Sequence, residues 1–88
     1  MTWDVRLSKT AARQLSNAPR SYQNFILERL DEMAVDPFRG DVKPLKGAEW
    51  QERYRKRVGR WRIIFIPNPS EHRVEISAII MRSEKTYR

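Results

Sequence analysis

Polar and apolar residues alternate over residues 3–7, near the start of the chain. This alternation predicts a short, half-buried strand. Ser8 follows the strand, and its hydroxyl can accept hydrogen bonds from the free amides of a first helical turn. The sequence therefore predicts a helix over about residues 9–17, with Ala12 and Leu15 facing inward.

Helical spacing of apolar residues continues in the next segment. Pro19 suits the first turn of a helix, and Asp36 ends it because a residue that precedes a proline avoids the helical region. The inward stripe of this second predicted helix comprises Tyr22, Phe25, Ile26, Arg29, Leu30, Met33 and Ala34. We interpret the stripe as core, since all its members except Arg29 are largely apolar.

The second half of the chain has the pattern of a strand meander. Residues 38–49 are predicted to form a loop, because glycines and a proline punctuate them. The predicted strands cover about residues 51–58, 61–66 and 73–81, joined by a tight turn at 59–60 and a proline-containing turn at 67–71. Short connections make neighbouring strands antiparallel. The expected fold is α+β, in the order β-α-α-β-β-β, with a helical hairpin on one face of a small, mainly antiparallel, twisted sheet.

Side chains alternate between the two faces of a strand, so the pattern also predicts which residues share a face. Arg53, Arg55 and Arg57 point one way, while Tyr54 and Val58 point the other way. In the next strand Arg62 shares a face with Ile64, and Trp61, Ile63 and Phe65 face the opposite side. If the helices cover the apolar face, Arg55, Arg57 and Arg62 line an uncovered, shallow, positive groove.

The 88-residue length allows one domain, expected to span residues 1–88, and leaves no room for a deep cofactor cavity beside a core. With no cysteine and His72 as the only histidine, we expect no disulfide, no metal site and no cofactor. No signal peptide and no apolar run of membrane-spanning length is visible, so a cytoplasmic protein with no membrane partner is expected.

The formal net charge of +7 is concentrated in residues 51–62, which hold six arginines and lysines against one acid. The basic residues are Arg53, Arg55, Lys56, Arg57, Arg60 and Arg62. One interpretation is a solvated strand whose charge prevents edge pairing. The excess of arginine and the interleaved Tyr54 and Trp61 favour the other interpretation, a surface that binds nucleic acid.

Two segments of the chain resemble the RelE/ParE toxin superfamily. The first runs from Pro44-Leu45-Lys46-Gly47 through Tyr54-Arg55-Lys56-Arg57-Val58-Gly59-Arg60 to Trp61-Arg62-Ile63-Ile64-Phe65, and the second is Ile80-Met81-Arg82-Ser83-Glu84-Lys85-Thr86-Tyr87. Members of this superfamily are toxins of type II toxin–antitoxin pairs. The resemblance implies either of two activities. The RelE branch cleaves mRNA in the ribosomal A site without a metal, and the ParE branch poisons DNA gyrase without cutting RNA.

The resemblance also implies site residues. Arg55 and Arg57 match the paired basic residues of the family, Arg62 the arginine of the following strand, Arg82 the basic residue after the last strand, and Tyr87 the C-terminal tyrosine. Arginines replace the lysines common at the paired positions. The sequence ends one residue after Tyr87, so the resemblance leaves the placement of this tyrosine open. We further expect Lys46, Arg53, Lys56 and Arg60 to contact RNA.

These residue types suit RNA cleavage by attack of a 2′-hydroxyl on the adjacent phosphate. We expect Arg55 and Arg62 to bind the scissile phosphate, and Arg57 to do so or to donate a proton, because guanidinium groups offer paired donors to phosphate. Tyr87 is the candidate general base. A tyrosine has a pKa of about 10, which neighbouring cations lower. Arg82 is the general acid or a further phosphate ligand. His72, alone in a predicted turn, is expected to be solvated.

An RNA-cutting toxin is the favoured function, with mRNA, the 70S ribosome and a cognate antitoxin as partners. A ParE-type gyrase poison is the main alternative, and a module that only holds nucleic-acid backbone is the third. Both toxin readings require neutralisation. We therefore expect an acidic or amphipathic antitoxin segment, with a helix over the sheet or beside the helical hairpin.

Overall fold

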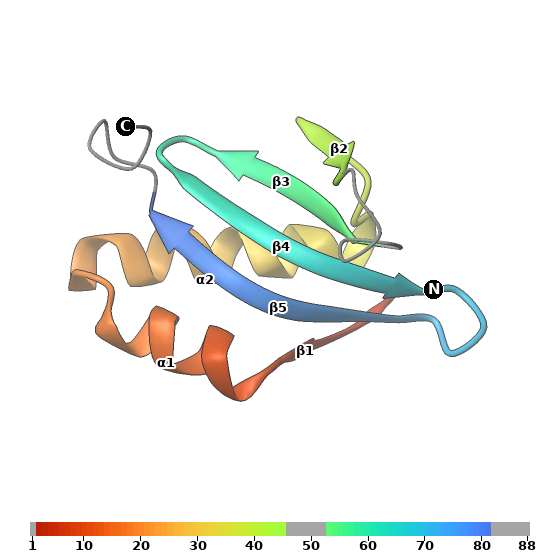
Figure 1. The fold of residues 1–88 in the computed structure, drawn as a ribbon, viewed down its shortest axis with the longest axis horizontal. Helices are drawn as coiled ribbons and strands as arrows, with labels where there is room; N and C mark the ends of the chain where they lie inside the picture. Colours follow the sequence, from red (N-terminus) through yellow and green to blue (C-terminus); the bar gives the residue numbers. More distant parts are fainter. Residues whose placement is uncertain (1, 46–52, 82–88) are drawn as a thin grey trace.

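The computed structural model describes residues 2–45 and 53–81, which form two layers (Figure 1). Both helices lie behind one face of a five-stranded sheet. The elements are β1 (Asp4–Leu7), α1 (Lys9–Asn17), α2 (Arg20–Val35), β2 (Val42–Pro44), β3 (Tyr54–Val58), β4 (Trp61–Asn68) and β5 (Arg73–Met81). The predicted α+β class is confirmed, as is the helical hairpin on one side of the sheet.

The strand order across the sheet is β1-β5-β4-β3-β2. The first strand of the chain lies parallel to the last, and all other neighbours are antiparallel. The prediction of a loop over residues 38–49 was wrong at Val42–Pro44, which pairs with β3 through Val42 and Lys56. Three residues are too few to show an alternating pattern, so only the pairing with β3 reveals this strand.

The central strand β4 is longer than predicted. It continues through Pro67 and Asn68, where Pro67 pairs with Val74 of β5. A proline is tolerated at a strand position that has no neighbour on its nitrogen side. In the described residues β3 begins opposite Phe65, so β4 has a neighbour only on the β5 side at Pro67. Local edge character thus allows the strand to include a residue that the sequence assigned to a turn.

The two helices begin and end close to their predicted bounds. The Ser8 hydroxyl accepts a hydrogen bond from the Ala11 amide at 3.0 Å, as the capping pattern predicted. Of the two residues of α1 predicted to face inward, Leu15 packs against the core, whereas Ala12 is exposed and its neighbour Ala11 is fully buried instead. In such a short helix, the angle at which it meets the sheet decides which small residue is buried.

The core lies between the helices and the inner sheet face. Its members include Ile26, Leu30 and Met33 of α2, and Trp61, Ile63, Phe65, Val74, Ile76 and Ile79 of the sheet. The predicted inward orientation of Trp61, Ile63 and Phe65 is confirmed. Tyr54 packs against the same core and stacks on Phe65, with ring centroids 5.8 Å apart. The residues that alternate with these core residues along each strand therefore lie on the sheet face turned away from the helices.

Candidate functional site

The sheet face opposite the helices, here called the open face, carries the predicted arginines. One row across the strands contains Lys43, Arg55, Ile64 and Ala78, and the next contains Arg57, Arg62 and Ile80. The three arginines that were expected to share a face thus occupy adjacent rows of β3 and β4. The structure brings these side chains to one surface because the β3–β4 hairpin sets the register.

That register depends on the tight turn between β3 and β4. The turn contains only Gly59 and Arg60, and Gly59 has a φ of +62°. A two-residue hairpin turn with a positive φ at its first position matches the type II′ geometry, which favours glycine there. The turn makes Val58 and Trp61 direct partners, so Arg57 and Arg62 follow as the next pair.

Arg57 and Arg62 are two like charges directly opposite each other. Such cross-strand neighbours have Cβ atoms about 5 Å apart, and their repulsion opposes sheet formation. The Nε atom of Arg57 is buried and has no hydrogen-bond partner among the described residues. An anion bound between the two guanidinium groups would relieve the repulsion and accept hydrogen bonds from them.

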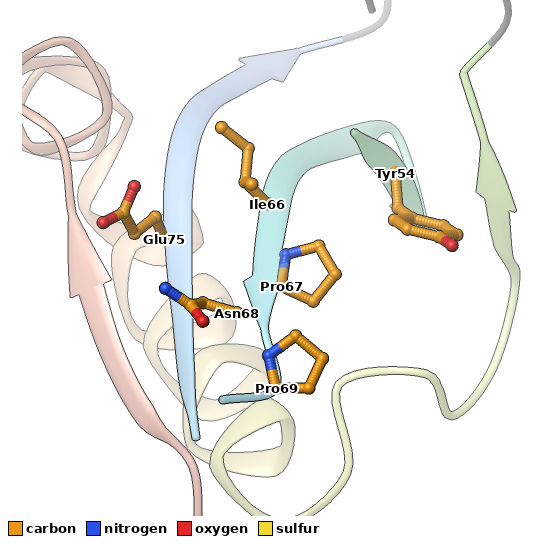
Figure 2. Close-up of a pocket in the computed structure, with 6 residues that line it drawn as sticks. All are labelled: Tyr54, Ile66, Pro67, Asn68, Pro69 and Glu75. Atoms are coloured by element: carbon orange, nitrogen blue, oxygen red, sulfur yellow. The ribbon is translucent and has the colours of Figure 1, made fainter. Parts of the chain in front are cut away.

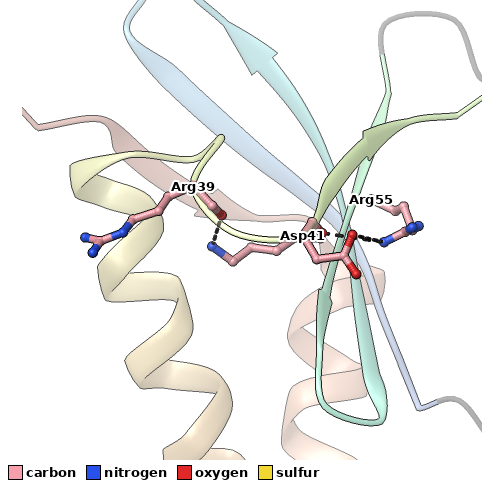
Figure 3. A network of polar contacts seen from close by, with 4 residues as sticks. Arg39, Asp41 and Arg55 are labelled. Carbon is pink, nitrogen blue, oxygen red and sulfur yellow. Dashed lines mark hydrogen bonds and ion pairs between the residues drawn. The ribbon is translucent and has the colours of Figure 1, made fainter.

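Arg55 is held by Asp41, which precedes β2 (Figure 3). Its Nη1 lies 3.3 Å from the Asp41 carboxylate and 3.5 Å from the Asp41 carbonyl oxygen. The Arg55 side chain is 13% exposed, whereas that of Asp41 is 45% exposed. The ion pair fixes Arg55 against the strand and offsets part of its charge on the open face.

Asp41 and Lys43 are site residues that the sequence reasoning missed. Lys43 is exposed on β2 and is the cross-strand neighbour of Arg55. Both residues lie in the segment that was predicted to be a loop. The polar–apolar–polar order of residues 41–43 is the only local signal for them, and it is too short to predict a strand.

The residues predicted to assist RNA binding are spread more widely. Arg60 is exposed in the hairpin turn, and Arg53 directly precedes β3. Lys56 points to the helix side and is 5% exposed, so the fold separates it from the open-face arginines. Lys46, Arg82 and Tyr87 lie outside the described residues.

Lys56 is a buried cation on the inner side of β3. Its Nζ donates a hydrogen bond to the Arg39 carbonyl oxygen at 2.9 Å. Burial lowers the pKa of Lys56 below its ordinary value, while Glu32 raises it by a smaller amount and Arg29 adds a smaller lowering of its own. The ammonium group is therefore held at a cost in solvation.

His72 lies in a turn, as predicted, but it is only partly exposed. It adopts a left-handed φ of +52°, and its ring stacks on Trp3 with centroids 4.4 Å apart. Its Nε2 is buried without a hydrogen-bond partner among the described residues. The packing of β1 beside β5 brings Trp3 over this turn, an effect that no local pattern shows.

A pocket lies at the end of β4 that is farther from the hairpin turn (Figure 2). It has a volume of about 440 Å³ and is lined by Tyr54, Ile66, Pro67, Asn68, Pro69 and Glu75. No arginine or lysine lines it, so its chemistry differs from that of the open face. In the described residues no three histidine, aspartate or glutamate side chains gather to hold a metal, and no helix is long and apolar enough to cross a membrane.

Comparison with known proteins gives one family match and several structural matches. Residues 5–86 match the family described as the ParE toxin of the type II toxin–antitoxin system parDE. No protein with curated annotation matches the chain.

The structural matches cover almost the whole chain. A RelBE toxin–antitoxin complex from Mycobacterium tuberculosis is 23% identical, with a TM-score of 0.84 over 93% of this chain and 100% of that one. The archaeal RelE–RelB complex from Pyrococcus horikoshii is 26% identical, with a TM-score of 0.77 over 96% and 99%. The isolated RelE toxin of E. coli is 15% identical, with a TM-score of 0.74 over 96% and 90%.

Proposed function

We propose that this chain, which belongs to the ParE toxin family of type II toxin–antitoxin systems within the RelE/ParE superfamily, is toxic through metal-independent cleavage of mRNA in the ribosomal A site. The observation that carries this proposal is the opposed pair Arg57 and Arg62, beside Arg55, on the open face. Two like charges side by side, on a sheet face that no described helix or strand covers, favour binding of a polyanion.

The cleavage step needs little besides charge and position. The 2′-hydroxyl of the RNA attacks the adjacent phosphorus, and the bond to the 5′-oxygen of the next nucleotide breaks. Negative charge grows on the phosphoryl oxygens as this happens, and arginine donors aimed at that point stabilise it. In the proposal, Arg57 and Arg62 hold the phosphate, and Arg55 reaches it from its ion pair with Asp41.

Two protons must also move. We propose Tyr87 as the base that takes the proton of the 2′-hydroxyl, and Arg82 as the group that protonates the leaving oxygen or holds the phosphate. Both roles come from the family resemblance. The contacts with the ribosome are part of the same proposal, as are Arg53 and Arg60 as additional phosphate contacts.

The test is brief induction of variants, followed by primer-extension mapping of mRNA ends. Arg62→Ala and Tyr87→Phe are expected to abolish both growth arrest and cleavage while the protein still folds. Arg13→Ala removes one positive charge from the exposed surface of α1 and serves as the matched control, which is expected to remain toxic. Growth arrest that persists in both site variants contradicts the nuclease proposal.

The match to the ParE family favours a second candidate, a DNA gyrase poison without nuclease activity. The open-face arginines would then contact DNA or gyrase. This activity predicts DNA breaks in induced cells and no new mRNA ends. The same induction experiment therefore separates the two candidates.

A cognate antitoxin is the expected partner in either case. Several of the similar structures are toxin–antitoxin complexes, which supports such a partner. The chain has a formal net charge of +7, so an acidic antitoxin segment would gain from charge complementarity.

A further inference from the structure

A separate pocket lies on the helix side of the sheet, between α2 and the C-terminal end of β3. Its volume is about 290 Å³. It is lined by Phe25, Arg29, Glu32, Arg39, Gly40, Asp41, Lys56, Arg57, Val58 and Gly59. Four of these side chains are cationic and two are anionic, so the lining is positive overall. The pocket is smaller than a typical ligand site but has room for one protein side chain.

Lys56 is the central polar group of this pocket. Its ammonium group has three donors, and the Arg39 carbonyl oxygen is its one hydrogen-bond acceptor among the described residues. No described carboxylate lies within ion-pair distance of its Nζ, although its side chain is almost fully buried. A buried charge with unused donors is costly, so an anion that entered the pocket would be stabilised by it.

Arg29 adds a second set of donors. It is a partly buried residue of α2 that pairs with Glu32 at 3.0 Å and lies over the Phe25 ring at 5.2 Å. Its Nε is buried and has no hydrogen-bond partner among the described residues. The aromatic ring and the guanidinium group give the pocket an apolar wall beside a charged one, which suits an aliphatic stem that ends in a charge.

Beside the pocket, no described strand pairs with β3 beyond the end of β2. The pairing of β2 with β3 ends at Val42 and Lys56, and the last contact is a hydrogen bond of 3.0 Å from the Arg57 amide to the Asp41 carbonyl oxygen. Val58 and Gly59 therefore lie beyond β2. A peptide that followed this edge could place a side chain directly into the pocket.

We propose that this pocket receives the carboxylate of a glutamate or aspartate side chain from the antitoxin, bound between Lys56 and Arg29. The identity of the partner rests on the proposed toxin function. The pocket opens on the helix side of β3, and Arg57 is the one open-face arginine that also lines it. Glu32 and Asp41 in its lining disfavour a doubly charged phosphate relative to a single carboxylate.

The test is an NMR titration of the full-length, 15N-labelled chain at constant ionic strength. The probe is N-acetyl-glutamate amide, and N-acetyl-glutamine amide is its neutral control. The carboxylate probe is expected to shift the amide signals of Gly40, Val58 and Gly59, and the neutral probe is not. Lys56→Met should weaken probe binding about tenfold, since it removes a charged hydrogen bond while keeping the length of the side chain.

Lys9→Met is the matched control, because this exposed lysine lies on α1 and does not line the pocket. It should bind the probe like the wild type. If Lys56→Met fails to fold, Arg29→Gln takes its place and should also weaken binding severalfold. Equal binding by the wild type and the pocket variant overturns the proposal. The proposal is also overturned if inorganic phosphate shifts the pocket signals and the carboxylate probe does not, because the pocket would then be a phosphate site.

The identity of the occupant is tested in the purified complex with the antitoxin. There the probe should no longer shift the pocket signals, because an antitoxin carboxylate fills the site. Pocket signals that still respond in the complex exclude the antitoxin as occupant. None of these measurements involves RNA cleavage, so the experiments can contradict the nuclease proposal and the pocket proposal independently of each other.

Discussion

At the scale of single residues, the open face shows a conflict between stability and binding. Arg57 and Arg62 are cross-strand neighbours on β3 and β4, where a pair of oppositely charged or apolar side chains would stabilise the sheet better. A site that binds an anion needs this arrangement before the anion arrives, because preformed donors avoid reorganisation during binding.

Arg57→Gln is accordingly expected to raise the free energy of unfolding, by a few tenths and at most about 1 kcal/mol. The gain should be largest at low salt and should fade at high salt, where the repulsion is screened. Urea unfolding measures it, with Arg13→Gln on α1 as the charge-matched control. A loss of stability in Arg57→Gln would show that Arg57 is held by attractive contacts instead.

Lys56 leads to a second prediction at this scale. Its pKa is lower in the folded state than the ordinary 10.5, because burial disfavours the ammonium group. Between these two pKa values the unfolded state binds more protons than the folded state, so stability rises with pH. Below the folded-state pKa the cost of the buried charge is present in full.

The wild type should therefore gain stability relative to Lys56→Met as the pH rises toward 10.5. Urea unfolding of both proteins from about pH 7 upward measures the difference, and comparison with Lys56→Met cancels the titration of the other groups. A difference that stays constant with pH would mean that the Lys56 ammonium group is as well solvated in the folded state as in the unfolded one.

At the scale of elements, the hairpin of β3 and β4 decides which side chains meet. Gly59 sits at the first position of its two-residue turn with a φ of +62°. A Cβ atom added there would meet the Phe25 Cζ at 4.0 Å, which is an ordinary contact. Any penalty at this position is therefore conformational and not steric.

Gly59→Ala is expected to lower the free energy of unfolding by roughly 1–2 kcal/mol, because an L-residue with a side chain disfavours this φ. Chemical denaturation measures the loss. Arg60→Ala changes the other turn residue, whose φ is not positive, and should stay within about 0.5 kcal/mol of the wild type. Equal stability of Gly59→Ala and the wild type would exclude a strained turn.

At the scale of the whole molecule, the fold separates two charged regions. The open face holds the arginines proposed to bind RNA, and the helix side holds the Lys56 pocket. Two residues connect them, because Asp41 pairs with Arg55, Arg57 lies opposite Arg62 on the open face, and both Asp41 and Arg57 line the pocket. One bend before β2 thus supports both surfaces.

Binding of single-stranded RNA by the whole molecule is expected to weaken with salt, with a slope of about −0.7 in log–log form for each phosphate contacted. Arg57→Gln should reduce the slope by about one such unit, whereas Arg13→Gln should leave it unchanged. Fluorescence titrations over a range of salt concentrations measure both slopes. An unchanged slope in Arg57→Gln would exclude Arg57 as a phosphate contact.

Much of this architecture follows from local pattern. The spacing of apolar residues predicted both helices and the three strands of the meander, and the Ser8 cap placed the start of α1. Alternation along β3 and β4 predicted that Arg55, Arg57 and Arg62 share a face, since the period of a strand is set by its backbone. The predicted roles of Arg82, Tyr87 and Lys46 stay predictions, because these residues lie outside the described ones.

Features that depend on distant segments could not be predicted from the sequence. The strand β2 exists because Val42 pairs with Lys56, and the ion pair of Asp41 with Arg55 follows from that pairing. Alternation places Lys56 on the helix side, but only the packed α2 shows that it is buried. Short-range spacing thus determined the elements and their faces, because backbone geometry repeats every few residues. Chain segments far apart in sequence decided burial and charge pairing, because those depend on what the fold brings alongside.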